Sequence, residues 1–260
     1  MADDGKRRWT GPGSGKSGSG QNGSGKRGSG KSGTPKDAEK KGSGRRMGER
    51  KVIARNAKSE SSKRWIERQL TDPYVQKAKS AGFRARAAFK LLEIDEKFRL
   101  LKPGQRVVDL GCAPGGWLQV AQQKGAAEIV GIDLLPVERL AGVHIIEGDV
   151  NEPADVAQML EGLTGPPDLV LSDMASNTTG HKQTDHLRTI ALVEMALGFA
   201  IDHLAPGGAF ASKVFQGGAT RDILEPLKAN FADVKHLKPP SSRAGSPEIF
   251  VIAKGFRGQR

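Results

Sequence analysis

The chain has 260 residues, with 41 Lys and Arg against 29 Asp and Glu, and its net charge is +12. This length allows one or two domains with a sizeable buried core. The single cysteine, Cys112, excludes an internal disulfide and most cysteine-based zinc sites, and we expect no metal. No apolar run is long enough to span a bilayer, and the N-terminus lacks the apolar stretch of a signal peptide. We therefore expect a soluble cytoplasmic protein.

Residues 1–58 are a basic segment rich in Gly, Ser and Lys. The first 50 residues carry 14 of the 34 glycines and show no apolar periodicity, which predicts disorder because too little apolar surface can be buried. Residues 1–60 hold 16 Lys and Arg against six Asp and Glu, whereas residues 61–260 hold 25 against 23. A flexible basic arm beside a nearly neutral domain favours contact with nucleic acid. A solubilising extension is the alternative.

The remaining residues, 59–260, are predicted to form one domain, with helices over 59–102 and a core over 103–256. Short helices are expected over 61–70 and 72–82. A stronger amphipathic helix is expected over 86–98, where apolar residues recur at helical spacing. Helical segments near 116–124, 153–162, 184–204 and 219–230 alternate with apolar strands. The predicted strands are 106–110, 128–133, 143–148, 168–173, 209–215, 233–238 and 249–254.

Strands that alternate with helices imply right-handed crossovers and an α/β fold. We predict a seven-stranded, mostly parallel sheet with helices on both faces. The last two strands are joined by the helix-poor loop "PPSSRAGSP", which favours an antiparallel pair and one antiparallel edge strand.

The stretch "VVDLGCAPGGW" predicts a strand, a glycine-rich turn and a helix. Its glycines, Gly111, Gly115 and Gly116, have a spacing that differs from the G-x-G-x-x-G of dinucleotide folds. Asp133 ends the second strand, where a carboxylate can accept both ribose hydroxyls, and Asp149 follows the third, within reach of an adenine amino group. Together they predict S-adenosylmethionine as the cofactor. Aspartates that cap helices or turns are the alternative.

Two other side chains of this loop have more than one interpretation. Trp117 could pack against the cofactor or belong to the core. As a nucleophile, Cys112 would indicate C5-methylation of a pyrimidine through a covalent adduct. It lies inside the cofactor loop, however, and the fourth strand ends in "SDMASN" without a cysteine. We interpret Cys112 as a packing residue.

Lys213 lies in the otherwise apolar strand "GAFASKVFQG", where its charge is costly unless it is paired. Asp173 ends the fourth strand, Glu248 enters the last strand, and Lys90 lies on the helix before the core. Two carboxylates would compensate two lysines whose charges oppose one another, which suits an amine that accepts a proton from a hydroxyl. Taken singly, Lys90 also fits a solvated or phosphate-contacting side chain, and Glu248 a charge at a strand edge.

The sequence contains, in this order, the motifs "RARAAFKL", "VVDLGCAPGGW", "DLLP", "GDV", "SDMASN", "KVFQG" and "SSRAGSPEIFVIA", and the resemblance that they carry covers roughly residues 61–256. With them the chain resembles the FtsJ/RrmJ (RlmE) family of ribosomal RNA large-subunit methyltransferases. The resemblance implies a Rossmann-like class I methyltransferase, a monomer, that uses S-adenosylmethionine to methylate the ribose 2′-hydroxyl of a uridine in 23S rRNA of the large ribosomal subunit. It also implies a catalytic tetrad of Lys90, Asp173, Lys213 (the base) and Glu248, and cofactor contacts at Gly115, Trp117, Asp133, Asp149 and Asp173.

The chain departs from the family pattern at three places. Ser176 stands where proline is usual, Gly245 and Pro247 stand where arginine and another residue are expected, and the basic tail has no counterpart. None of these touches the tetrad, so we expect an active enzyme. The alternatives are a related 2′-O-methyltransferase for tRNA or mRNA caps and a non-catalytic RNA-binding assembly factor. A nicotinamide dehydrogenase is opposed by the loop spacing.

Deletion of residues 1–55 is expected to weaken RNA binding and to flatten its salt dependence, because fewer counterions are then released. Catalysis should persist. Binding measured over a series of salt concentrations checks this. A full-length variant whose tail lysines and arginines are replaced by glutamine is the control, because it removes the charge of the tail and keeps its length. An unchanged salt slope would support the solubility interpretation.

Overall fold

The computed structural model describes residues 70–176, 179–216 and 221–258. These ranges lie within one compact unit, Lys51–Arg260. The predicted tail over 1–58 and nearly all of the predicted helix over 61–70 fall outside them. Of the helices in the described ranges, none is both long enough and apolar enough to cross a membrane.

The sheet has seven strands in the order β3-β2-β1-β4-β5-β7-β6. Their bounds are β1 (Arg106–Leu110), β2 (Glu128–Asp133), β3 (His144–Glu147), β4 (Leu169–Ser172), β5 (Ala209–Phe215), β6 (Phe231–Leu237) and β7 (Glu248–Phe256). The first five strands pair in parallel, which confirms the predicted mostly parallel sheet.

The antiparallel strand is β7, which pairs with β5 on one side and with β6 on the other. It therefore lies one place inside the edge, and the edge strand β6 runs parallel to β5. The short connection between β6 and β7 specifies that the two strands run in opposite directions. It does not specify which of them takes the outer place, and here the last strand enters the gap beside β5.

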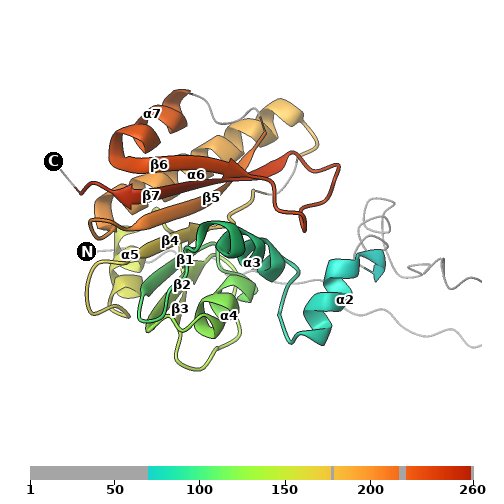
Figure 1. The fold of residues 1–260 in the computed structure, drawn as a ribbon, viewed down its shortest axis with the longest axis horizontal. Coiled ribbons are helices and arrows are strands. Elements are labelled where there is room, and N and C mark those ends of the chain that lie inside the picture. The colour runs from blue at the N-terminus through green and yellow to red at the C-terminus, as the bar shows by residue number, and fades with distance from the viewer. Residues whose placement is uncertain (1–69, 177–178, 217–220, 259–260) are drawn as a thin grey trace, which may run out of the picture. The chain divides into compact units, whose positions relative to one another are not determined.

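Six helices accompany the sheet in the described residues: α2 (Pro73–Ser80), α3 (Ala87–Phe98), α4 (Gly116–Gln123), α5 (Pro153–Leu160), α6 (Lys182–His203) and α7 (Arg221–Asn230). Figure 1 shows α3 and α4 over one face of the sheet, and side chains of α5, α6 and α7 pack into the core on the other face. The helices predicted between the strands are thus present on both faces.

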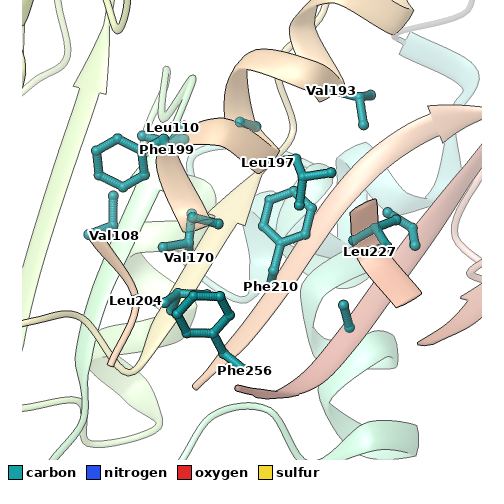
Figure 2. Close-up of a cluster of buried hydrophobic side chains, with 14 of the residues drawn as sticks. Val108, Leu110, Val170, Val193, Leu197, Phe199, Leu204, Phe210, Leu227 and Phe256 are labelled. Carbon is teal, nitrogen blue, oxygen red and sulfur yellow. The ribbon is translucent and has the colours of Figure 1, made fainter. Parts of the chain in front are cut away.

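Successive strand residues bury their side chains in two separate cores, as expected for a sheet covered on both faces. Val108, Val170 and Phe210 belong to the core that contains α6 side chains (Figure 2), whereas Leu171 and Ala211 belong to the core beneath α3 and α4. Lys213 follows Ala211 by two residues in β5, so the strand period directs it to the face that carries α3.

Candidate active site

The ends of four parallel strands surround a pocket of about 320 Å³. It is lined by residues from the segment that follows each of β1, β2, β3 and β4, as expected at the carboxyl edge of an open α/β sheet. Four of the predicted site residues line it together: Gly111, Asp133, Asp149 and Asp173. The structure therefore brings together the glycine loop and the aspartates singled out in the sequence.

Short backbone hydrogen bonds fix the orientation of Asp133 and Asp149. Asp133 Oδ2 accepts from the amide of Ala113 at 2.8 Å, and its Oδ1 accepts from the amide of Leu135 at 2.9 Å. Asp149 Oδ1 accepts from the backbone and side-chain nitrogens of Asn151, both at 2.9 Å. A carboxylate has about four acceptor positions. Both aspartates thus order their turns and keep further lone pairs for a ligand.

Gly111 admits the loop that follows β4. Its φ is +77°, and a Cβ built there would lie 2.5 Å from Cγ of Met174. An L-residue at this position would be strained and would displace Met174, which lines the pocket.

Three residues that were predicted to contact the cofactor, Gly115, Gly116 and Trp117, are not among those that line the pocket within the described chain. Trp117 is 3% exposed, its indole nitrogen donates to the carbonyl of Ala87 at 2.7 Å, and its ring lies 5.7 Å from that of Phe250. Of the two interpretations of Trp117, the structure supports the one in which its side chain belongs to the core. Gly115 and Gly116 begin α4 beneath the loop.

The predicted tetrad forms a chain of alternating charges. Lys213 is 6% exposed, and its Nζ donates to the carbonyl of Asp173 at 2.7 Å and lies 3.2 Å from Asp173 Oδ1. Lys90 Nζ lies 3.3 Å from Asp173 Oδ2 and 2.9 Å from each carboxylate oxygen of Glu248. Buried charges are tolerated when they are paired in this way. The order Lys213–Asp173–Lys90–Glu248 leaves no excess charge.

Of the two lysines, Glu248 pairs with Lys90 and not with Lys213. Its second partner is Ser242, whose Oγ donates to Oε1 at 2.9 Å. The β5–β7 register places Phe250, not Glu248, opposite Lys213. Within the described ranges, the side chain of Glu248 therefore contacts α3 and the loop before β7, and Asp173 is the carboxylate that contacts Lys213.

A second pocket, of about 600 Å³, adjoins the tetrad and is lined by basic side chains. Lys90 and Glu248 line it together with Arg86 and Arg243. Both arginines pair with the buried carboxylate of Asp72, which also accepts from the Tyr74 amide as the cap of α2. Two guanidinium groups share one carboxylate here, which leaves a positive surface suited to phosphate.

Sequence reasoning missed Asp72 and Arg243. The pair Asp-Pro at the start of α2 signals a helix cap, but no sequence signal joins Asp72 to residues so far along the chain. Gly245 lines the basic pocket, and the carbonyl of Pro247 accepts from the Gln216 amide at 2.6 Å. The departures from the family pattern at these two positions thus lie in the loop that borders this pocket.

Cys112 is 3% exposed and packs against β2, where a Cβ on Gly131 would lie 2.8 Å from its Sγ. Burial, and then the charges of Asp109 and Asp133, raise the pKa of the thiol far above its ordinary value. The sulfur stays protonated and enclosed, which agrees with its interpretation as a packing residue.

Asp109 is a second feature that sequence reasoning missed. It lies in β1 and is 2% exposed, and neither carboxyl oxygen has a hydrogen-bond partner among the described residues. Burial, and then the charges of Asp173 and Asp133, raise its pKa well above the ordinary value, which favours the protonated carboxyl group. A charge inside the apolar run "VVDL" is the same signal that singled out Lys213.

The parallel sheet, the glycine loop and the acidic strand ends define a Rossmann-like α/β enzyme with a nucleoside-sized pocket. The model of the FtsJ-like methyltransferase family matches residues 83–256, and the chain belongs to this family. It is a methyltransferase by that membership.

Named relatives agree with this assignment. The chain is 64% identical over 257 residues to the ribosomal RNA large subunit methyltransferase E of Hyphomonas neptunium, covering 99% of this chain and 100% of that one. It is 62% identical over 200 residues to the protein of the same name from Novosphingobium aromaticivorans, covering 76% and 90%. A solved ribosomal RNA methyltransferase of Plasmodium falciparum superposes with a TM-score of 0.61 at 30% identity, covering 68% of this chain and 100% of that one.

The raised pKa of Asp109 predicts a particular pH dependence of stability. Because its folded-state pKa lies above that of the unfolded chain, its contribution is complete below the unfolded pKa of about 3.9 and declines as pH rises toward the folded pKa. Asp109→Asn removes this titration. Above pH 4 the free energy of unfolding of this variant should therefore fall less steeply with pH than that of wild type, by up to about 1.4 kcal/mol per pH unit.

Urea unfolding at a series of pH values measures this slope. The exposed Asp233→Asn serves as the matched control for the same substitution at the surface. An identical slope in Asp109→Asn and wild type would show that Asp109 ionises freely in the folded protein.

Proposed function

We propose that the protein transfers a methyl group from S-adenosylmethionine to the ribose 2′-hydroxyl of a uridine in 23S rRNA of the large ribosomal subunit. The observation that carries the proposal is the paired network Lys213–Asp173–Lys90–Glu248, which adjoins the pocket at Asp173. The names of the relatives support rRNA as the substrate.

The residues that line the pocket fit the proposed cofactor. Its volume of about 320 Å³ is in the range of small-molecule sites. Asp133 and Asp149 keep acceptor positions for hydroxyl and amino groups, and Gly111 leaves room for Met174, which lines the pocket. When bound, S-adenosylmethionine supplies an activated methyl group on a positively charged sulfur.

In this mechanism Lys213 acts as the neutral amine: its Nζ binds the 2′-hydroxyl and accepts its proton, which gives the ammonium that Asp173 compensates. Two contacts to Asp173, one to its carbonyl and one to its carboxylate, hold that nitrogen in one place. Lys90 stands on the other side of the same carboxylate and orients the ribose, and Glu248 balances its charge. Exact orientation of the hydroxyl supplies a large share of the acceleration, since the donor is already activated.

The basic pocket supports RNA as the acceptor. Arg86 and Arg243 line it beside Lys90, so that phosphates bound there would flank a ribose at the tetrad. The basic residues of 1–60 would add a contact that does not depend on sequence. We propose that the enzyme acts as a monomer in the cytoplasm.

Lys213→Ala is expected to lower methyl transfer by about 10²- to 10⁴-fold while cofactor affinity stays unchanged, because the proton acceptor is lost and the pocket is not. Tritium transfer to undermethylated large subunits measures the rate, and calorimetry measures binding. Lys235→Ala, an exposed lysine of β6, is the matched control and should keep the wild-type rate. A wild-type rate in Lys213→Ala would contradict the mechanism.

Nucleotide-resolution mapping of 2′-O-methyl groups in cells with and without the protein identifies the acceptor. The proposal requires that a uridine of 23S rRNA loses its methyl group. Loss confined to a tRNA or to an mRNA cap would contradict the substrate, and no loss in any RNA would contradict the activity.

A further inference from the structure

Arg84 lies in the short connection between α2 and α3 and joins two loops of the pocket. Its Nη1 donates to the carbonyl of Glu138 at 2.7 Å and to that of Pro114 at 3.3 Å, and its Nη2 donates to the carbonyl of Arg139 at 2.9 Å. Pro114 belongs to the loop after β1, whereas Glu138 and Arg139 belong to the loop after β2.

These two loops form one side of the cofactor pocket. Gly111 and Ala113 line it from the first loop, and Asp133, Leu134 and Leu135 line it from the second. The loops contact each other directly where the Ala113 amide donates to Asp133. The guanidinium of Arg84 adds a second connection, because its planar set of donors reaches carbonyls of both loops at once.

Arg84 is itself held in place by α4. Its backbone amide donates to Oε1 of Gln119 at 2.8 Å, and Nε2 of Gln119 donates to the carbonyl of Gly82 at 3.0 Å. The arginine is therefore anchored at its backbone and engaged at its head, unlike a solvated surface arginine.

Gly115 provides the space that this arrangement needs. Its φ is +103°, and a Cβ built there would lie 2.7 Å from Nη1 of Arg84 and 3.3 Å from its Cδ. Gly115 is not among the residues that line the pocket in the described chain. The space that Arg84 occupies is therefore a reason for glycine at position 115, and this reason needs no direct contact between Gly115 and a ligand.

We propose that Arg84 is a positioning residue of the cofactor site, which sets the separation of the loops that carry Gly111 and Asp133. Gly115 contributes by admitting the Arg84 guanidinium beside the loop. The inference rests on the proposed function, because it takes S-adenosylmethionine as the ligand of this pocket. It differs from an RNA-contacting role for Arg84, since three of the guanidinium's hydrogen bonds are made within the protein.

The test compares cofactor binding by the full-length wild type, Arg84→Ala and Arg84→Lys, using calorimetry with S-adenosylhomocysteine as the probe. Arg84→Ala should bind about tenfold more weakly, because charge-assisted hydrogen bonds between the loops are lost. Arg84→Lys should recover part of the affinity, since an ammonium can reach one loop but cannot bridge both in the same plane.

Arg106→Ala is the matched control for lost stability. Arg106 begins β1 and pairs with Asp168, at the opposite end of this strand from the pocket. This variant should keep wild-type cofactor affinity even where its melting temperature falls. Steady-state kinetics should show a raised KM for the cofactor in Arg84→Ala, with kcat at saturating cofactor and KM for RNA close to those of wild type.

A double-mutant cycle tests the role of Gly115. Gly115→Ala should weaken cofactor binding less in the Arg84→Ala background than in wild type, because the displaced guanidinium is then absent. Additive losses would overturn this part of the proposal.

Wild-type cofactor affinity in Arg84→Ala would overturn the positioning role, and so would a loss confined to RNA affinity. A wild type that binds no S-adenosylhomocysteine would instead contradict the proposed function itself, which separates the two failures.

Discussion

The Lys213 ammonium, buried at the end of β5, requires a carboxylate beside it, and the rest of the site follows from that requirement. Asp173, at the end of the neighbouring strand β4, meets it with its carbonyl and its carboxylate. Asp173 is paired in turn with Lys90 of α3, and Lys90 with Glu248 of β7. Because removal of one partner would leave a buried charge uncompensated, the four side chains hold a helix and three strands in one arrangement.

The connection between α2 and α3 contacts both the loops of the pocket at the strand ends and the residues of the basic pocket. Arg84 donates to carbonyls of the loops after β1 and β2, whereas Arg86, two residues later, pairs with Asp72 and donates to the carbonyl of Ser241. The segment is not yet helical at Arg84, so neighbouring arginines can face in different directions. The pocket and the basic surface are therefore supported by one short stretch of chain outside the sheet.

The sequence was sufficient for features that depend on one element at a time. The bounds of β1, β2 and β5 agree with prediction because strands buried on both faces are apolar runs between turn residues. Lys213 was recognisable because its charge interrupts such a run, and Asp109 could have been found in the same way. Features that join distant segments were out of reach: the inner place of β7, the inward direction of Trp117, the partner of Glu248, and the hydrogen bonds of Arg84. Periodicity gives the face of one element, not what lies against it.

The two pockets differ in charge, and the ion network lies where they meet. Asp133, Asp149 and Asp173 line the pocket at the strand ends, whereas Arg86, Lys90 and Arg243 line the other. Under the proposed function, a sulfonium cation is favoured in the first and phosphate anions in the second. Asp173 belongs to the acidic pocket and Lys90 to the basic one, and their charges lie 3.3 Å apart. Lys213 is bonded to the same Asp173, so the proposed proton acceptor stands where a ribose held by the basic pocket can face a methyl donor held by the acidic one.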